Sequence, residues 1–238
     1  MSPLTRAVCF DVDFTLIHPG PVFEGHGYRE FCARHGIHTC EPSAFEGAVS
    51  SASDLLDRSP GHVYDAQVFI DYIRHIIEAM GGSGEGLDAC AAEIYEEWAA
   101  CRHFSLYDDV LPALRRLRAR GLLIGLISNT HRSLDTFQRH FELQDLVAAA
   151  VSSCEHGFNK PHPSIFQTAL QLLAVAPEEA VMVGDNYRHD IEGALAVGMR
   201  AILLRRSRDH MPGAVPAGPG TPLRVPVIRT LGELSDLL

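Results

Sequence analysis

The chain has 238 residues, of which 46% are hydrophobic and 21% are charged, a composition that excludes a disordered or collagen-like protein. Its 20 Lys and Arg residues against 30 Asp and Glu residues give a net charge of −10. This balance argues against nucleic-acid partners and against a polybasic membrane surface, because both need a basic face.

The apolar runs of the sequence are all short. None approaches the roughly 18 residues that a membrane-spanning helix needs, and the first run, which ends at Asp11, is too short for a signal peptide. The six cysteines include no C-x-x-C pair, and several lie in apolar runs. These features predict a cytoplasmic protein with buried free thiols.

Short, nearly continuous apolar runs predict strands that are buried on both faces, as in a parallel sheet. In chain order these runs cover residues 7–10, 122–127, 146–151, 180–183, 201–204 and 225–228. The third run is weaker, and the last predicts a short edge strand. Helical patterns separate the later strands, over residues 110–117, 134–141, 163–173 and 191–197. The alternation predicts an α/β fold in which helices cover a parallel sheet in three layers.

The stretch from residue 18 to residue 105 breaks this alternation. It contains no strand-like run and shows helical patterns over residues 28–35, 44–56, 66–80 and 87–101. Removing these 88 residues leaves 238 − 88 = 150 residues, the size of one ordinary α/β domain. We therefore expect a core of residues 1–17 and 106–238 and an inserted helical domain of residues 18–105. Residues 211–226 are rich in Pro and Gly and predict a surface loop.

Polar residues follow the predicted strands where each one ends. Asp11 and Asp13 follow the first strand, Ser128 and Asn129 the second, and Asp185 the fourth, with Lys160 and Asp190 in adjoining loops. In open α/β sheets, ligands bind at the carboxyl ends of the strands. Four carboxylates at one sheet edge would repel each other, and a divalent cation relieves that repulsion. Hard oxygen ligands favour Mg²⁺.

These motifs together resemble the haloacid dehalogenase (HAD) superfamily, in its phosphatase-like branch with a helical cap. The D-x-D-x-T motif begins at Asp11, and Gly157–Phe166 matches the family pattern G-x-x-K-P-D-P-x-I-F except for His162. Val183–Ala194 matches the family's fourth motif, and an insertion after Leu16 matches the place of its first type of cap. The resemblance implies a Rossmann-like core with parallel sheet, a C1-type cap over residues 18–105, and Mg²⁺ as cofactor.

The resemblance also implies roles for the motif residues. Asp11 is expected to be the nucleophile that forms an aspartyl-phosphate, and Asp13 the acid and base. Ser128, Asn129 and Lys160 are expected to bind the phosphoryl group, together with backbone amides of the turn through Phe14. Asp11 and Asp185 are expected to bind the metal, with Asp13 contributing its backbone carbonyl. For Asp190 two roles stay open, a metal contact, direct or through water, and the orientation of Lys160.

The expected activity is hydrolysis of a phosphate ester of a small metabolite. Three alternatives remain: a phosphomutase acting on a sugar phosphate, a haloacid dehalogenase, and a catalytically silent binding module. Asp13 argues against the dehalogenase, because family members of that kind lack an acid at this position and release halide without a proton. The physiological substrate, the cap residues that select it, and a monomeric or dimeric state stay open.

Other polar residues have simpler interpretations. Thr15 is expected to cap the turn after the acids, Asn129 and Thr130 to cap the following helix, and Asp108 and Asp109 to begin another helix. Arg132 is expected to be a solvated helix residue, with contact to a substrate anion as the alternative. Trp98 is expected in the core of the helical insertion. Four insertion residues are candidates for substrate contact: His18, Arg29, Arg58 and Tyr64.

Overall fold

The first strand, β1 (Ala7–Phe10), is completely buried and lies at the centre of the sheet. The structure is a computed structural model that describes residues 4–56, 60–206 and 225–238. In it, β1 pairs in parallel with β4 (Leu123–Ser128) on one side and with β6 (Ala180–Gly184) on the other. Both neighbours are apolar because the sheet is covered on both faces.

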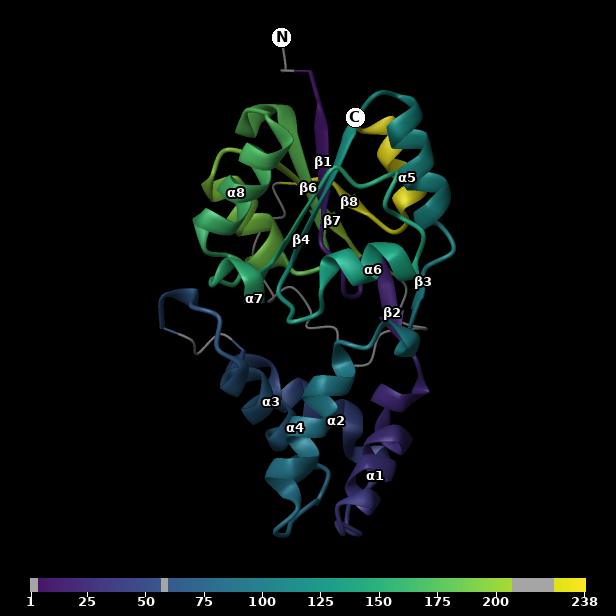
Figure 1. Cartoon of the computed structure of the whole chain (residues 1–238), viewed down its shortest axis with the longest axis vertical. Helices are drawn as coiled ribbons and strands as arrows, with labels where there is room; N and C mark the ends of the chain where they lie inside the picture. The colour runs from purple at the N-terminus through teal and green to yellow at the C-terminus, as the bar shows by residue number, and fades with distance from the viewer. Residues whose placement is uncertain (1–3, 57–59, 207–224) are drawn as a thin grey trace. The chain divides into compact units, whose positions relative to one another are not determined.

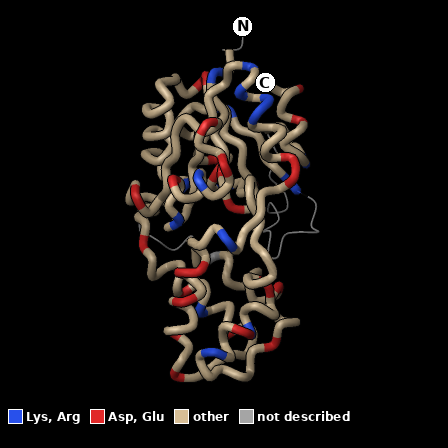
Figure 2. Tube along the Cα trace, turned by 45° about the vertical axis from the view of Figure 1, so that its right-hand side comes forward, with Lys and Arg blue, Asp and Glu red and all other residues tan. Residues whose placement is uncertain are grey.

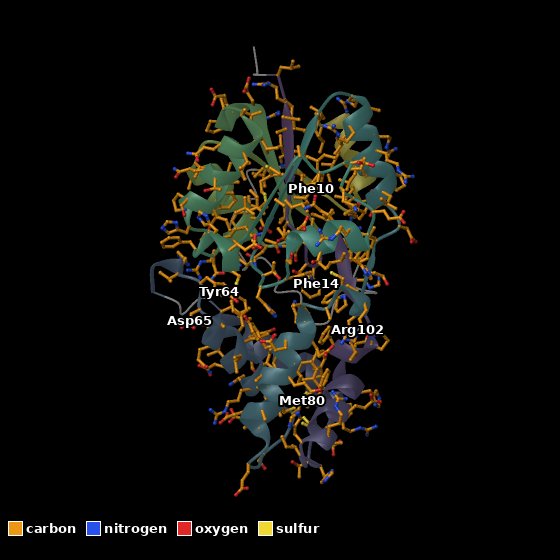
Figure 3. All side chains as sticks on the ribbon, viewed as in Figure 1. Phe10, Phe14, Tyr64, Asp65, Met80 and Arg102 are labelled. Atoms are coloured by element: carbon orange, nitrogen blue, oxygen red, sulfur yellow. The ribbon has the colours of Figure 1, made fainter. Side chains whose placement is uncertain are left out.

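Six parallel strands form the main sheet, in the order β5-β4-β1-β6-β7-β8 (Figure 1). The outer strands are β5 (Ala149–Ser152), β7 (Arg200–Leu204) and β8 (Val227–Ile228). The topology confirms the predicted α/β fold with a parallel sheet. Figure 3 labels Phe10, in β1, and Phe14, which follows the carboxyl end of that strand.

Helices cover the two faces of the sheet, with α8 and α5 on opposite sides (Figure 1). Ala7 and Cys9 of β1 pack with Ile165, Phe166 and Ala169 of α8. The helical elements of this unit are α5 (Val110–Ala119), α6 (Leu134–His140), α7 (Ser153–His156), α8 (Pro163–Leu173), η6 (Pro177–Glu179), η7 (Tyr187–Glu192), α9 (Gly193–Ala196) and η9 (Leu231–Asp236). Gly121 and Gly198 follow α5 and α9 with positive φ values of 81° and 88°, as helix-ending glycines do.

Two predicted elements differ in the structure. The third strand begins only at Ala149, because the amides of Leu146 and Val147 bond back to the carbonyl of Leu143 in a local turn. The helix predicted over residues 191–197 begins earlier than expected, as a π-helical turn, η7, that ends at Glu192, and the remainder is the short α9. Turns of this type occur often at functional sites, and η7 carries Asp190.

The described residues divide into two compact units. One contains the sheet and consists of residues 4–18, 106–206 and 225–238, and the other consists of residues 19–56 and 60–105. The helical unit has its own core, which includes Phe31, Ile76 and Met80 (Met80 is labelled in Figure 3). Its helical elements are η1 (Pro21–Phe23), α1 (Gly25–Arg34), η2 (Pro42–Ala44), α2 (Phe45–Ala52), η3 (Ser53–Leu55), η4 (Pro60–His62), α3 (Ala66–Ala79), α4 (Leu87–Trp98) and η5 (Cys101–His103).

The expectation of no strand between residues 18 and 105 is wrong at both ends of that stretch. Two short strands, β2 (Ile17–Pro19) and β3 (Phe104–Leu106), form a two-stranded sheet. With three residues each, they are too short to show a periodic pattern. Most of the loop predicted over residues 211–226 lies outside the described residues.

The cysteines are all free, and five of the six are buried, with Cys154 exposed. Buried thiols of this kind behave as small apolar side chains. Among the described residues, no helix combines the length and the apolar character needed to cross a membrane.

Candidate active site

The chain turns sharply after β1, and this turn carries Asp11 and Asp13. The Asp11 amide donates to the carbonyl of Val183 at 2.9 Å, which extends the pairing with β6 past the end of β1. Phe14 adopts a left-handed φ of 62°, and its amide donates to the carbonyl of Ile17 at 2.7 Å. The Phe14 amide is therefore already bonded within the turn, so it is not among the amides that could bind a phosphoryl group.

Lys160 places its ammonium group at the centre of the acidic residues. Its Nζ donates to Asp11 Oδ1 at 2.6 Å, to Asp190 Oδ1 at 2.7 Å and to the carbonyl of Ile127 at 2.8 Å. Burial lowers the pKa of Lys160, but the carboxylates of Asp11 and Asp190 outweigh this effect and hold the pKa above its ordinary value. Lys160 is therefore a permanent cation at this edge of the sheet.

Three carboxylates gather around this position. Asp11, Asp185 and Asp190 each offer an oxygen, and these oxygens lie within 4.8 Å of one another. Figure 2 shows acidic segments, in red, near a blue basic one in the interior of the unit that contains the sheet. Burial raises the pKa of Asp11 to about 7, although the Lys160 ammonium lowers it. Burial and then the charge of Asp11 raise the pKa of Asp185 well above its ordinary value. Neighbouring carboxylates add to both shifts, and Lys160 opposes them.

The π-helical turn η7 and Gly184 together position Asp190. Asp190 Oδ2 accepts the amide of Asn186 at 3.0 Å, while its Oδ1 accepts from Lys160. A Cβ at Gly184 would lie only 2.2 Å from Asp190 Oδ2, so only glycine leaves room for this carboxylate at the end of β6. Both roles left open for Asp190 fit this geometry, because its Oδ1 holds Lys160 and it belongs to the carboxylate group that could hold a metal.

Ser128 ends β4, and its hydroxyl oxygen is buried without a hydrogen-bond partner among the residues that the structure describes. Such orphaned groups are rare in proteins, because burial without a partner costs about 1–3 kcal/mol. The preceding residue, Ile127, gives its carbonyl to Lys160. The hydroxyl of Ser128 thus lies one residue from a contact of the ammonium group and is free to bind a ligand.

Contrary to the expectation, Asn129 and Thr130 do not cap the following helix, because Ser133 caps α6. Asn129 instead binds the backbone of Lys160 twice, accepting from its amide at 2.6 Å and donating to its carbonyl at 3.0 Å. Thr130 Oγ1 accepts the amide of Arg132 at 3.0 Å. The loop after β4 therefore holds the backbone of Lys160, whose side chain reaches Asp11 at the end of β1.

Arg132 is not the solvated helix residue that we expected. Its side chain is only 1% exposed, and its Nη1 donates to Asp13 Oδ1 at 3.0 Å and to Asp13 Oδ2 at 3.2 Å. The carboxylate of Asp13 is not in the metal-compatible group of Asp11, Asp185 and Asp190. The side chains of the two acids of the D-x-D motif thus pair with different cations.

The other expectations have mixed outcomes, since Asp109 begins α5 and Trp98 packs inside the helical unit as expected, but Thr15 does not cap the turn. Thr15 is buried with its Oγ1 3.5 Å from Asp185 Oδ1, rather than capping the turn. Asp109 precedes α5 but makes no side-chain capping bond. Its carboxylate instead accepts from Arg206 at 3.0 and 3.1 Å. Trp98 packs against Phe23, with ring centroids 4.5 Å apart.

The candidates for substrate contact fall in different places. The ring of His18 lies 4.9 Å from that of Tyr107, and Arg29 contacts His26. The hydroxyl of Tyr64 meets that of Tyr95. Arg58 lies outside the described residues. Each of the three described candidates therefore has a neighbour in the protein.

Arg206 is a residue that the sequence reasoning missed. Besides Asp109, it binds the carbonyl of Thr15 at 2.8 Å and stacks over Tyr107 at 3.7 Å from the ring centroid. It thereby ties the turn that carries the D-x-D-x-T motif to the segment before α5. A basic residue just past the strand predicted over residues 201–204 was the available signal, since it falls at the carboxyl edge of the sheet.

The comparison with known families agrees with this geometry. Residues 5–198 match the model of the haloacid dehalogenase-like hydrolases, which is more than half of the chain. The chain belongs to this family. The resemblance seen in the sequence motifs is thereby confirmed, and this HAD-like hydrolase has the acidic cluster at the carboxyl edge of its sheet.

Individual relatives of this HAD-like hydrolase match along most of their length. The glyceraldehyde 3-phosphate phosphatase of Pyrococcus furiosus is 41% identical over 84% of this chain and 80% of its own. The ribulose-1,5-bisphosphate 5-phosphatase of Halopiger xanaduensis is 32% identical over 99% of this chain and 100% of its own. Among solved structures, the 2-haloacid dehalogenase of Pseudomonas syringae pv. Tomato superposes with a TM-score of 0.62 at 27% identity, over 98% of both chains.

Proposed function

We propose that the protein is a Mg²⁺-dependent phosphomonoester hydrolase that forms an aspartyl-phosphate on Asp11 and acts on a small phosphorylated metabolite. The observation that carries the proposal is the environment of Asp11. Its Oδ1 is held by Lys160 at 2.6 Å, and it shares a cluster of hard oxygen ligands with Asp185 and Asp190. The names of the two phosphatase relatives, which specify small phosphorylated metabolites, support the substrate class.

The donor set of the cluster fits a Mg²⁺ ion. All three groups are carboxylates, and burial, together with the charges of neighbouring carboxylates, raises the pKa of Asp11 and of Asp185. Asp11 and Asp185 would hold the ion, and the carbonyl of Asp13 would add a ligand. The bound ion would neutralise the charge repulsion between the substrate phosphate and the carboxylates.

The side chains divide the first step of the reaction among them. Lys160 holds Asp11 Oδ1, which leaves Oδ2 to attack the phosphorus atom. The hydroxyl of Ser128 and the ammonium of Lys160 bind phosphoryl oxygens as charge develops on them. The bond from phosphorus to the ester oxygen breaks, and Asp13 supplies the proton to the leaving alcohol.

The second step restores Asp11. A water molecule attacks the phosphorus atom and gives its proton to the carboxylate of Asp13. The bond between phosphorus and Asp11 Oδ2 breaks, which releases inorganic phosphate and the Asp11 carboxylate. The unit of residues 19–105 would act as the cap that selects the alcohol part of the substrate, as lids do in other enzymes.

The proposed function is tested by phosphate release from 4-nitrophenyl phosphate and from a panel of sugar phosphates, nucleotides and phospho-acids. We expect turnover in the presence of Mg²⁺ and its loss in EDTA, with recovery when Mg²⁺ is added back. Activity that EDTA does not change would contradict the proposal. Phosphoryl transfer to an added sugar phosphate in preference to water would indicate a mutase instead.

Replacing Ser128 by alanine should separate activity from stability. Since the hydroxyl has no partner in the described protein, we expect the free energy of unfolding to change by less than about 0.5 kcal/mol. Loss of a donor to the phosphoryl oxygens should lower kcat/KM by about 10-fold to 100-fold. Urea unfolding and steady-state kinetics measure the two effects.

Ser153→Ala is the matched control for Ser128→Ala. The Ser153 hydroxyl accepts the Thr130 amide at 3.0 Å and is buried. Its loss should cost about 1–3 kcal/mol of stability, because the amide then lacks its partner. If Ser128→Ala destabilised the protein as much as Ser153→Ala, the Ser128 hydroxyl would have a structural role.

The affinity for Mg²⁺ should fall as the pH is lowered from about 8 to 6. The pKa of Asp11 is raised to about 7 and that of Asp185 is also raised, so that protons compete with the metal. Each displaced proton should weaken binding by roughly tenfold per pH unit below the pKa. Isothermal titration calorimetry at pH 8, 7 and 6 measures this, and Asp11→Asn should flatten the dependence. A constant affinity over this range would contradict the prediction.

A further inference from the structure

Arg132 is a buried charge whose place in the chemistry no motif explains. It is among the largest fully buried side chains of the protein, in the loop between β4 and α6. Taking a guanidinium group out of water costs several kcal/mol unless a partner compensates. The side chain that compensates this cost therefore shows where the charge of Arg132 acts.

The Arg132 guanidinium group binds the Asp13 carboxylate. One nitrogen, Nη1, lies 3.0 Å from Oδ1 and 3.2 Å from Oδ2, so that both oxygens of Asp13 are held at one place. Asp13 is 16% exposed at its side chain, which leaves it accessible to a water molecule. The backbone of Arg132 is in turn held by Thr130 Oγ1 at 3.0 Å. These contacts connect Asp13 to the loop that follows β4.

The two buried cations therefore pair with different carboxylates. Lys160 binds Asp11 and Asp190, and Arg132 binds Asp13. Without Arg132, the Asp13 side chain would lose its ion pair and would be free to rotate. A proton acceptor is effective only when it lies within hydrogen-bond reach of the proton that it takes.

We propose that Arg132 is a positioning residue that holds the Asp13 carboxylate as proton acceptor for hydrolysis of the aspartyl-phosphate. The inference rests on the proposed function. In this step the water proton passes to Asp13, the new bond forms between the water oxygen and phosphorus, and the bond from phosphorus to Asp11 breaks.

A substrate whose leaving group needs no proton separates the role of Arg132 in the second step from the first step. 4-Nitrophenolate leaves without a proton, so that formation of the aspartyl-phosphate from 4-nitrophenyl phosphate does not need Asp13. Only the second step then depends on Arg132. Because kcat/KM reports the steps through the first irreversible one and kcat also includes the second step, the two constants should respond differently.

The test compares Arg132→Met with the native enzyme in Mg²⁺, using 4-nitrophenyl phosphate. We expect kcat to fall at least about 10-fold and KM to fall with it, leaving kcat/KM within about 3-fold. Stopped-flow traces should show a burst of 4-nitrophenolate before the slower steady state. Arg132→Lys should restore part of kcat, because it keeps a cation near Asp13.

Two further variants complete the design. Arg139→Met, which removes an exposed arginine of α6 paired with Asp135, should leave all constants unchanged. Asp13→Asn in the Arg132→Met background should cost much less than the product of the two single effects, because both act on one carboxylate. Should Arg132→Met fold poorly, as judged by circular dichroism, Arg132→Lys and its burst carry the test.

A parallel fall of kcat and kcat/KM in folded Arg132 variants, or no change in either, would overturn the inference. An inactive native enzyme would overturn the proposed function instead, and an active one that lacks this pattern only the role of Arg132. Binding of Mg²⁺, measured by calorimetry, should be the same in Arg132→Met, because Asp13 contributes no side-chain oxygen to the carboxylate cluster.

Discussion

Asp11→Asn is expected to abolish phosphate release, with kcat lower by on the order of 10⁴-fold or more, as when other enzymes lose their nucleophile. The carboxamide keeps the shape of the side chain but is a poor nucleophile at phosphorus. Phosphate release over hours, with the native enzyme diluted as reference, measures the loss. Full activity of the variant would rule out the aspartyl-phosphate mechanism.

The same substitution should not weaken the fold in EDTA at pH 8. The pKa of Asp11 in the folded protein is about 7, above its ordinary value of 3.8, so the contribution of its neutral form to stability is fully present below pH 3.8. That contribution is lost as the pH rises through about 7. Asparagine stays neutral, and Asp11→Asn should therefore unfold at the same or a higher temperature. The control is Asp108→Asn, the same change at an exposed position, which should alter neither activity nor stability.

Lys160→Met should have the second largest effect, because it should lower both kcat and the free energy of unfolding. Methionine matches the unbranched lysine stem, and the two bonds from Asn129 to the Lys160 backbone can persist. Asp11 and Asp190 would face each other without the ammonium group. Breaking a buried ion pair in this way costs about 3–5 kcal/mol, and loss of a cation at the phosphoryl group should lower kcat by about 10²-fold to 10³-fold.

The stability part is measured by urea unfolding in EDTA. Adding Asp190→Asn to Lys160→Met should recover some of the lost stability, because it removes one of the two repelling charges, while activity stays low. A Lys160→Met protein as stable as the native one would show that the carboxylates do not depend on the ammonium group. The pair of measurements separates the structural effect of Lys160 from its effect on the reaction.

The fold could be predicted from the sequence because strand burial leaves a direct mark on it. Each strand of the six-stranded sheet overlaps a predicted apolar run and extends at most one residue beyond it. The bounds of β1 match those of its run. The π-helical turn η7 could not be predicted in this way. Its shape follows from the bonds of Asn186 and Asp190 across the turn, and a helical pattern of apolar residues does not distinguish it from an α-helix.

The candidate site was predictable to the same degree and for a related reason. Parallel strands end at one edge, so that polar residues after β1, β4 and β6 must come together. The structure brings Asp11, Asp185, Asp190 and Lys160 into one cluster. Ser128 lies beside it, while Asp13 turns to a different cation. That side chain lies next to the turn at Phe14, which has a left-handed φ. A phenylalanine in the sequence does not predict this backbone conformation.

The sequence by itself determined the fold class, the family and which residues lie at the carboxyl edge, because periodicity and motif order are local properties of the chain. The partners of the buried charges were decided only by tertiary structure. Arg132 and Asp13 are 119 residues apart, and Arg206 and Asp109 are 97 apart. Such pairs form where folding removes water from both charges at once. The net charge of −10 therefore says less about the site than the choice of which acids pair with a buried cation.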